Sequence, residues 1–191
     1  MSTPQSKEAA LIDSVITVVG EVGLETVSMA QILEHAGVGA GTVYRYFDGK
    51  DGLLLAAYQR CELNQLTACS EGDSRDGPWP ERVEAMAGRL LKFLVENPDQ
   101  ASYIDQYAVS PVTKGSSERE VMASWAALVV FFGEGVAKRY CRGLGVHGSI
   151  AATFGMVGGV AFEIRSSDLT PKARLLKAVP RAVRAMLCGD K

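Results

Sequence analysis

Residues 28–53 read SMAQILEHAGVGAGTVYRYFDGKDGL, and this stretch decides how the N-terminal part of the chain folds. Ser28 suits a helix N-cap, and Gln31 three residues later completes a capping box. The apolar residues that follow are spaced as on one buried helical face: Met29, Ile32, Leu33 and Ala36. Gly37 then provides the left-handed residue that commonly ends a helix. We therefore predict a short helix between Ser28 and Gly37.

A second short helix is predicted directly after this turn, over residues 40–47. Val43 and Phe47 are four positions apart and share its inward face. Its outward face carries a hydroxyl, an aromatic ring and a guanidinium, from Thr42, Tyr44 and Arg45. Two short helices joined by a small-residue turn, the second with such an exposed face, form the layout of a helix-turn-helix DNA reader.

Over residues 8–58 the chain resembles the N-terminal domain of the TetR-type transcriptional repressors. The resemblance is carried by an ordered set of short motifs: Gly20-Glu21-Val22-Gly23, Thr26-Val27-Ser28, Ile32, Ala36-Gly37-Val38, Gly41-Thr42-Val43-Tyr44, Tyr46-Phe47, Lys50 and Leu53-Leu54. Gly49 departs from the family pattern, which usually has a serine or asparagine cap there. The resemblance implies a ligand-responsive repressor that binds a palindromic operator in double-stranded DNA as a homodimer.

Seven residues are assigned to the DNA interface by this resemblance. Those implied to contact mainly phosphates are Ser28, Thr42, Tyr44, Tyr46 and Lys50. Those best placed to reach base edges are Gly41, Thr42, Tyr44 and Arg45. Among them only Arg45 is able to make a bidentate contact to guanine. A half-buried packing role is the alternative for Tyr46.

Hydrophobic periodicity predicts helices through the rest of the chain, at residues 6–21, 50–69, 80–97, 99–109, 117–142, 146–166 and 171–188. Ser117 and Glu120 form another potential capping box, and nothing suggests a strand. We therefore expect an all-α protein of about nine helices. Residues 1–52 would form a three-helix DNA-binding domain, and residues 53–191 a larger bundle for ligand binding and dimerisation.

Aromatic and polar side chains recur at helical spacing in the larger domain. The candidate pocket residues are Phe93, Tyr103, Gln106, Tyr107 and Trp125. Judged alone, aromatic residues at such spacing are more often core than ligand contacts. The resemblance implies an enclosed small-molecule pocket in the helical body, so we assign these residues to an unidentified small-molecule effector.

The helix predicted at residues 146–166 contains mid-helix glycines, each of which costs about 1 kcal/mol relative to alanine. Ala151, Gly155 and Gly159 share one face and permit close backbone approach, either within the subunit or across a dimer interface. The resemblance favours the dimer, with the last two helices of each subunit forming a four-helix seam. Val179 and Val183 would contribute to the same seam from the last helix.

The remaining composition indicates no catalytic or metal site. The four cysteines form no CxxC pair, and the two histidines are far apart in sequence. No nucleophile motif or glycine-rich phosphate loop is present, so we expect neither an enzyme nor a bound cofactor.

The N-terminus has no signal-peptide layout, and cysteine usage fits a reduced cytoplasmic setting. The uncharged stretch over residues 143–162 has the length of a membrane span, but it contains six glycines. A buried interface helix is the better interpretation, so we expect no membrane role.

Charge is distributed unevenly along the chain. Residues 1–52 carry three basic and seven acidic side chains, whereas residues 138–191 carry ten basic and three acidic ones. Nucleic-acid-binding domains usually show the opposite balance. This asymmetry motivates an alternative function: a helical small-molecule- or partner-binding protein whose DNA reader is weak or vestigial.

Overall fold

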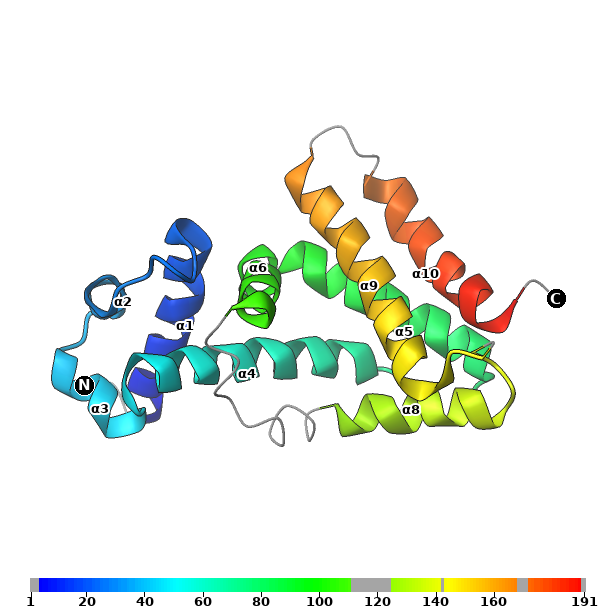
Figure 1. The fold of residues 1–191 in the computed structure, drawn as a ribbon, viewed down its shortest axis with the longest axis horizontal. Coiled ribbons are helices and arrows are strands. Elements are labelled where there is room, and N and C mark those ends of the chain that lie inside the picture. The colour runs from blue at the N-terminus through cyan, green and yellow to red at the C-terminus, as the bar shows by residue number, and fades with distance from the viewer. Residues whose placement is uncertain (1–3, 111–124, 142, 168–171, 190–191) are drawn as a thin grey trace. The chain divides into compact units, whose positions relative to one another are not determined.

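The computed structural model describes residues 4–110, 125–141, 143–167 and 172–189. Within these ranges the protein has nine α-helices, one 3-10 turn and no strand, which confirms the all-α prediction. The elements labelled in Figure 1 are α1 (Pro4–Val22), α2 (Met29–Ala36), the 3-10 turn η1 (Ala40–Thr42), α3 (Val43–Tyr46), α4 (Gly49–Ser70), α5 (Trp79–Glu96), α6 (Pro98–Val109), α8 (Ala126–Ala137), α9 (Gly145–Ser166) and α10 (Lys172–Cys188).

The helices group into two compact units. Unit 1 comprises Met1–Leu63 and Pro98–Glu118, and unit 2 comprises Asn64–Asn97 and Arg119–Lys191. The long helix α4 contributes to both units, and α6 belongs to the first. The division between a DNA-binding and a ligand-binding domain after residue 52 is a functional boundary, and it stays a prediction.

Unit 1 is organised around an apolar core that receives residues from α1, α2, α3, α4 and α6. The two short reader helices each insert one fully buried side chain into this core, Ile32 from α2 and Val43 from α3. From α6, the Tyr103 hydroxyl donates a 2.9 Å hydrogen bond to the carbonyl of Leu54 in α4. Helices α2 and α3 are too short to be stable alone, so this packing holds them in place.

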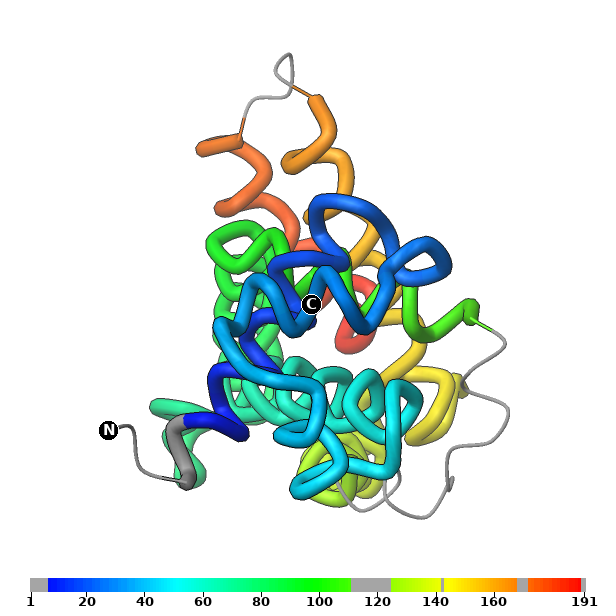
Figure 2. The backbone as a smooth tube through the Cα atoms, turned by 90° about the vertical axis from the view of Figure 1, so that its left-hand side faces the viewer, coloured from blue at the N-terminus to red at the C-terminus, as the bar shows by residue number. Residues whose placement is uncertain are grey.

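Unit 2 is built on α5, which packs against both α9 and α10. Figures 1 and 2 show α9 and α10 lying side by side. The indole of Trp79 donates a 3.0 Å hydrogen bond to the carbonyl of Phe131 in α8. A Cβ atom on Gly135 would overlap the Trp79 ring, so only glycine lets α8 approach the start of α5 this closely.

The helix predicted at residues 117–142 differs most from the structure. Helix α8 ends at Ala137, five residues earlier than expected, and the predicted capping box at Ser117 and Glu120 lies outside the described residues. The helix ends because Arg139 adopts a left-handed conformation with φ of 63°. The N–H groups of Arg139 and Tyr140 bond back to Val136 and Gly135, which is a Schellman motif.

Candidate nucleic-acid interface

The first reader helix, α2, begins and ends with the predicted caps. The Ser28 hydroxyl oxygen accepts the N–H of Gln31 at 3.3 Å, and the Gln31 side-chain oxygen accepts the N–H of Ser28 at 2.8 Å. At the other end Gly37 is left-handed, with φ of 63°, and the N–H of Val38 bonds to the carbonyl of Leu33. Ser28 is exposed, so its capping group lies at the surface of unit 1.

The second reader helix is shorter than predicted. Residues 40–47 form the 3-10 turn η1 and the single α-helical turn α3, and the chain becomes extended at Phe47. Tight 3-10 turns are common at helix N-termini, where the first N–H groups lack helical partners. The change in helix type leaves the predicted faces in place, because Val43 is fully buried whereas Tyr44 exposes 74% of its surface.

The other residues assigned to base contacts also lie at the surface. Arg45 and Gly41 are exposed, and Thr42 is partly exposed. A Cβ atom on Gly41 would meet nothing within 4 Å, so the backbone there is open to a ligand. This exposure is what DNA contacts require, and the contacts themselves stay predictions.

Tyr46 is half-buried and packs against the core of unit 1, as its alternative role requires. Its ring also lies near the neighbouring guanidinium, with Cζ of Arg45 5.9 Å from the ring centroid. That distance is at the outer range of a cation–π contact. The Tyr46 ring can therefore orient the Arg45 guanidinium, in addition to any phosphate contact that the Tyr46 hydroxyl makes.

Lys50 connects the start of α4 to the loop before α2. Its ammonium donates a hydrogen bond to the carbonyl of Val27, the residue directly before Ser28. Gly49 stands where the family pattern usually has a serine or asparagine cap. It is left-handed with φ of 68°, a conformation that glycine adopts without strain. The fold thus brings Ser28 and Lys50 to one edge of the reader, although 22 positions separate them in the sequence.

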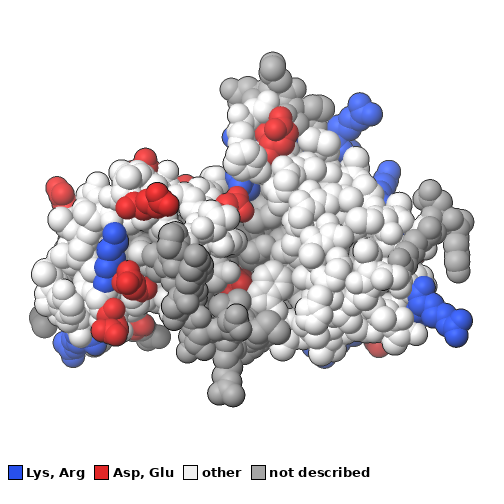
Figure 3. Space-filling view, viewed as in Figure 1, with Lys and Arg blue, Asp and Glu red and all other residues white. Residues whose placement is uncertain are grey.

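The surface around this reader is acidic. Figure 3 shows more acidic than basic side chains on the face of unit 1 that it presents. Of the three basic residues in positions 1–52, Arg45 and Lys50 belong to the reader helices and the start of α4, and Lys7 belongs to α1. This region therefore has few cationic side chains that a phosphate could contact.

The five predicted pocket residues are divided between the two units. Tyr103, Gln106 and Tyr107 belong to unit 1, whereas Phe93 and Trp125 belong to unit 2. Tyr103 and Tyr107 are buried with their rings stacked, 6.1 Å between centroids, and burial raises the pKa of Tyr103. Both tyrosines thus contribute to the core of unit 1, which was the alternative to a pocket role.

Gln106 and Trp125 each contact a residue of their own unit. The side-chain oxygen of Gln106 accepts the N–H of Leu24 at 2.8 Å, beside a cavity of about 290 Å³ within unit 1. The centroid of the Trp125 ring lies 4.9 Å from the centroid of the Phe154 ring in α9. A role in effector binding stays a prediction for all five residues.

A larger cavity, of about 650 Å³, lies within unit 2 and is lined by none of the five. It lies between the end of α4, the following loop, α5 and α8. Sequence reasoning missed it because its walls come from residues up to 68 positions apart, from Leu66 to Glu134. In the sequence, the only sign of this cavity is that charged residues stand beside apolar helical segments. That pattern does not by itself indicate a cavity.

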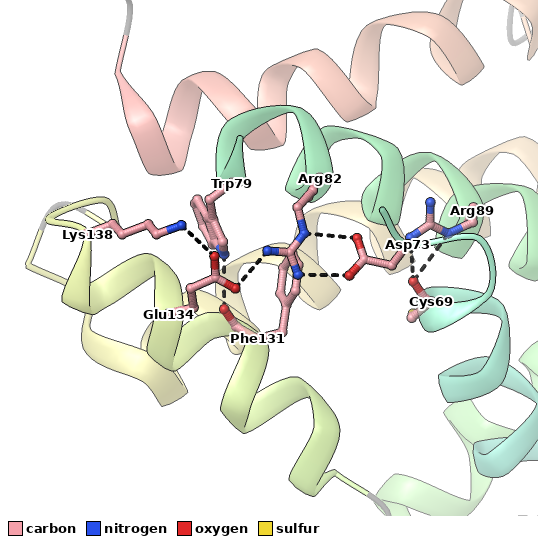
Figure 4. Close-up of polar contacts among 8 residues, drawn as sticks. All are labelled: Cys69, Asp73, Trp79, Arg82, Arg89, Phe131, Glu134 and Lys138. Atoms are coloured by element: carbon pink, nitrogen blue, oxygen red, sulfur yellow. Dashed lines mark hydrogen bonds and ion pairs between the residues drawn. The ribbon is translucent and has the colours of Figure 1, made fainter. Parts of the chain in front are cut away.

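Three residues of the cavity lining, Asp73, Arg82 and Glu134, belong to an ion-pair network. Figure 4 shows the contacts of this network. Arg82 is only 7% exposed and donates to both oxygens of Asp73, at 3.1 and 2.8 Å, and to Glu134 at 2.7 Å. Lys138 also donates to Glu134 at 2.7 Å. These hydrogen bonds lower the pKa of Asp73, through Arg82, and of Glu134, through Lys138 and Arg82.

The predicted dimer residues fall into two sets. Ala151, Gly155 and Gly159 are exposed on one face of α9, and Cβ atoms on the two glycines would meet nothing within 4 Å. Val179 and Val183 are instead buried within a single chain, where α10 packs on α5. These valines stabilise the subunit itself, because the apolar stripe of α10 is already covered by α5.

Helix α9 is the only described helix long and apolar enough to cross a membrane. Its most apolar window has a mean hydropathy of 1.3 and is 22% buried. One such helix is weak evidence for a membrane span, because interface helices of soluble proteins have the same composition.

Two of the buried cysteines carry thiols with raised pKa values. Burial raises the pKa of the Cys61 and Cys69 thiols to about 12, so both are neutral at physiological pH. In the described part of the chain, no group of three or more histidine, cysteine or carboxylate side chains is arranged so that it could hold a metal ion.

Comparison with known proteins places this reader in a family. Residues 11–57 match the family described as bacterial regulatory proteins, tetR family. The chain is 30% identical over 95 residues to the HTH-type transcriptional repressor KstR of Mycolicibacterium smegmatis, a match that spans 49% of this chain and 46% of that relative. The chain thus aligns with about half the length of this curated relative.

Solved structures extend the similarity of fold to nearly the whole chain. A TetR family transcription regulator from Marinobacter aquaeolei has a TM-score of 0.82 at 17% identity, over 96% of both chains. The transcriptional regulator FadR from Bacillus subtilis, solved in complex with stearoyl-CoA, has a TM-score of 0.73 at 18% identity, over 96% of this chain and 99% of that one. Residues 11–57 are therefore a tetR-family domain, and the chain as a whole has the fold of solved TetR-family regulators.

Proposed function

We propose that the protein is a cytoplasmic transcriptional repressor that binds a palindromic operator in double-stranded DNA as a homodimer and responds to a small-molecule effector. Two readers would enter successive major grooves about one helical turn apart. The effector would favour a conformation whose reader spacing no longer fits the operator. The size of that response is limited by the difference in effector affinity between the two conformations.

The observation that carries this proposal is the exposed face of the second reader helix. Tyr44 and Arg45 are exposed on a helical turn that is anchored by the buried Val43. A protein that used this unit only for packing would gain nothing from exposing an aromatic ring there, because burial of the ring is what stabilises a fold. Exposure beside a buried anchor is what insertion into a groove requires.

The roles of the reader residues follow from their positions. Arg45 and the open backbone at Gly41 are proposed to reach base edges, together with Thr42 and Tyr44. Ser28, Tyr46 and Lys50 are proposed to contact phosphates. Lys50 retains donors for a phosphate after bonding to Val27, because an ammonium group has three N–H groups.

The dimer is proposed to form through the exposed small-residue face of α9. Ala151, Gly155 and Gly159 would permit close approach of two α9 helices, and the exposed Phe162 extends the same apolar surface. Exposed apolar surface of this kind is favourable to bury between two copies of a chain. The contribution of α10 would come from its exposed side, since Val179 and Val183 face α5 within the subunit.

The effector is proposed to bind in the helical body. FadR, a protein of the same fold, was solved in complex with stearoyl-CoA, which supports a ligand-binding body in this fold. Phe93 and Trp125 remain candidates for contacts in unit 2, and Tyr103, Gln106 and Tyr107 for contacts in unit 1.

The test is selection of the preferred DNA sequence from a random pool, followed by titration of the selected duplex. A palindromic site bound by two chains would support the proposal. Recovery of no enriched sequence would contradict it.

The alternative, a ligand- or partner-binding protein with a vestigial reader, is favoured by the acidic N-terminal region, with three basic and seven acidic residues in positions 1–52. It predicts weak binding that does not distinguish one duplex from another. Competition with unrelated DNA therefore separates the two functions.

A further inference from the structure

The 650 Å³ cavity of unit 2 has the size of a small-molecule site. Its walls are mainly apolar, with Leu66 from α4, Met86 from α5, and Leu128 and Phe131 from α8. Cys69 adds an uncharged thiol, because burial raises its pKa to about 12. Such a surface favours a ligand with a hydrophobic body.

The charged residues of the lining balance one another. Asp73 and Glu134 supply two negative charges, and Arg75 and Arg82 supply two positive charges. Each carboxylate oxygen of Asp73 and Glu134 already accepts a hydrogen bond, from Arg82 or from Lys138. An organic cation would meet carboxylates whose charge Arg82 and Lys138 already balance, and an organic anion would lie near two carboxylates as well as two arginines.

The same network retains capacity for an uncharged polar group. Arg82 has five N–H groups, of which the contacts to Asp73 and Glu134 use three. Each carboxylate also has more lone pairs than the bonds it accepts. The Arg82 guanidinium lies over the Phe131 ring, with Cζ 5.1 Å from its centroid, so the polar and apolar walls meet at this point. A hydroxyl group there would find both donors and acceptors.

We propose that this cavity, in place of the five residues predicted from the sequence, is the effector site and that its ligand is an uncharged, largely apolar molecule carrying a hydroxyl group, such as a lipophilic alcohol or phenol. This inference rests on the proposed responsiveness to a small molecule. The ligand's ring or chain packs against Leu66, Met86 and Phe131, and its hydroxyl bonds to the ion-pair network. Binding needs no change in the charge of any residue.

Four compounds with one ring system test the ligand class: 2-naphthol, naphthalene, 2-naphthoate and 2-naphthylmethylammonium. Their affinities for the full chain are measured at pH 7 by equilibrium dialysis. We expect 2-naphthol to bind at least tenfold more tightly than either charged compound and about threefold more tightly than naphthalene. Equal binding of naphthalene or of a charged compound would overturn the proposed class, as would no binding of 2-naphthol up to its solubility.

Two matched variants test the location. Ala127 lines the cavity, whereas Ala137 is exposed at the other end of the same helix. We expect Ala127→Trp to weaken 2-naphthol binding at least tenfold by filling the cavity, and Ala137→Trp to leave it unchanged. Thermal melts verify that both variants are folded. Wild-type affinity in a folded Ala127→Trp variant would place the ligand elsewhere.

The charge balance is tested with Glu134→Gln, which removes one carboxylate while keeping the side-chain shape. Its cavity then has a net positive charge, so affinity for 2-naphthoate should rise at least tenfold. An affinity for 2-naphthoate that does not rise in this variant would overturn the role of the network.

Operator titration without any compound is a separate measurement. If the chain binds its operator but does not bind the four compounds as expected, only the proposed ligand class and site are wrong. If the chain binds 2-naphthol but no operator, the proposed repressor function is wrong.

Discussion

Tyr44 exposes 74% of its surface beside the fully buried Val43. Because the ring packs against little of its own fold, Tyr44→Ala should leave the thermal stability within about 0.5 kcal/mol of wild type. The same change should weaken operator binding at least tenfold, since the proposed contact is lost. Fluorescence anisotropy of a labelled operator and circular dichroism measure the two quantities. A folded variant with wild-type affinity would remove Tyr44 from the interface.

Arg45 is the only reader residue with a guanidinium, and its side chain is exposed above the half-buried Tyr46. Arg45→Ala should reduce discrimination at one operator position by about 1 to 3 kcal/mol, the value of a bidentate contact to guanine. Binding to operators with each base at that position gives the measurement. Arg45→Lys is the control, because it keeps the charge without the bidentate geometry. An equal loss on every sequence would identify Arg45 as a phosphate contact.

Residue conformations were predictable where their cause is local. The Ser28 capping box and the left-handed Gly37 follow from side chains within three residues and from the backbone freedom of glycine. The left-handed Arg139 carries no such signal, because an arginine rarely adopts that conformation. The bond from Lys50 to Val27 joins residues 23 positions apart, so no local pattern indicates it.

At the scale of elements, helix types were predictable and some boundaries were not. The expected helix over residues 40–47 is divided between η1 and α3, because one turn of helix is held by Val43 and ends where Phe47 becomes extended. Amphipathic periodicity located the buried stripe of α10, with Val179 and Val183. It did not reveal that α5, rather than a second subunit, covers this stripe.

The Arg82 network joins three elements of unit 2: α5, the loop after α4, and α8. Replacing Arg82 with methionine leaves Asp73 and Glu134 without their shared partner, and should cost about 3 kcal/mol of unfolding free energy at pH 7. Urea denaturation measures the loss. The control is Arg181→Met, since Arg181 is 78% exposed and its 3.9 Å pair with Glu84 contributes at most about 1 kcal/mol.

The cost of Arg82→Met should depend on pH. Folding lowers the pKa of Asp73 and of Glu134, so their contribution is present above the unfolded pKa of about 4 and is lost as pH falls through the folded values. Thermal melts of wild type and variant should therefore converge between pH 7 and pH 3. A difference in melting temperature that stays constant over this range would show that packing, not charge, is what Arg82 provides.

Gly155 and Gly159 allow a test of whether two subunits meet at the exposed face of α9. Both are exposed and have open space around them, so leucine fits each position within one subunit. Gly155→Leu and Gly159→Leu should thus keep the subunit folded and shift sedimentation from dimer to monomer. Gly133→Leu in α8, also with open space, is the matched control and should stay dimeric. Dimers in all three variants would move the interface away from this face.

At the scale of the whole molecule, the all-α class and the reader were predictable because each depends on local periodicity and caps. The compact units and the large cavity were not, since both depend on contacts between distant segments. Unit 1, for example, joins residues up to 63 with α6, which begins at residue 98. The cavity requires Asp73, Arg82 and Glu134 to meet, and their spacing fits no single helical face.

The charge distribution of the whole chain gives a final test. Only Arg45 and Lys50 supply cations from the reader and the start of α4, so two readers neutralise about four phosphates. Each phosphate neutralised on duplex DNA contributes about −0.9 to the slope of log affinity against log salt, which predicts a slope of about −3.6 or shallower. Exposed carboxylates around the reader release no counterions from DNA, so they do not make the slope of log affinity against log salt steeper.

The ten basic residues in positions 138–191 are the competing source of phosphate contacts. Two of those in α10 are already paired within unit 2: Arg184 lies 3.1 Å from Glu84, and Arg181 lies 3.9 Å from the same side chain. We expect Lys172→Gln combined with Lys177→Gln, two exposed α10 lysines, to leave the slope unchanged, and Lys50→Gln to make it shallower by about 1.8 for two subunits. A titration of operator binding from 50 to 200 mM salt measures all three proteins. A wild-type slope far steeper than −3.6 that falls in the α10 variant would mean that the basic C-terminal region contacts the duplex.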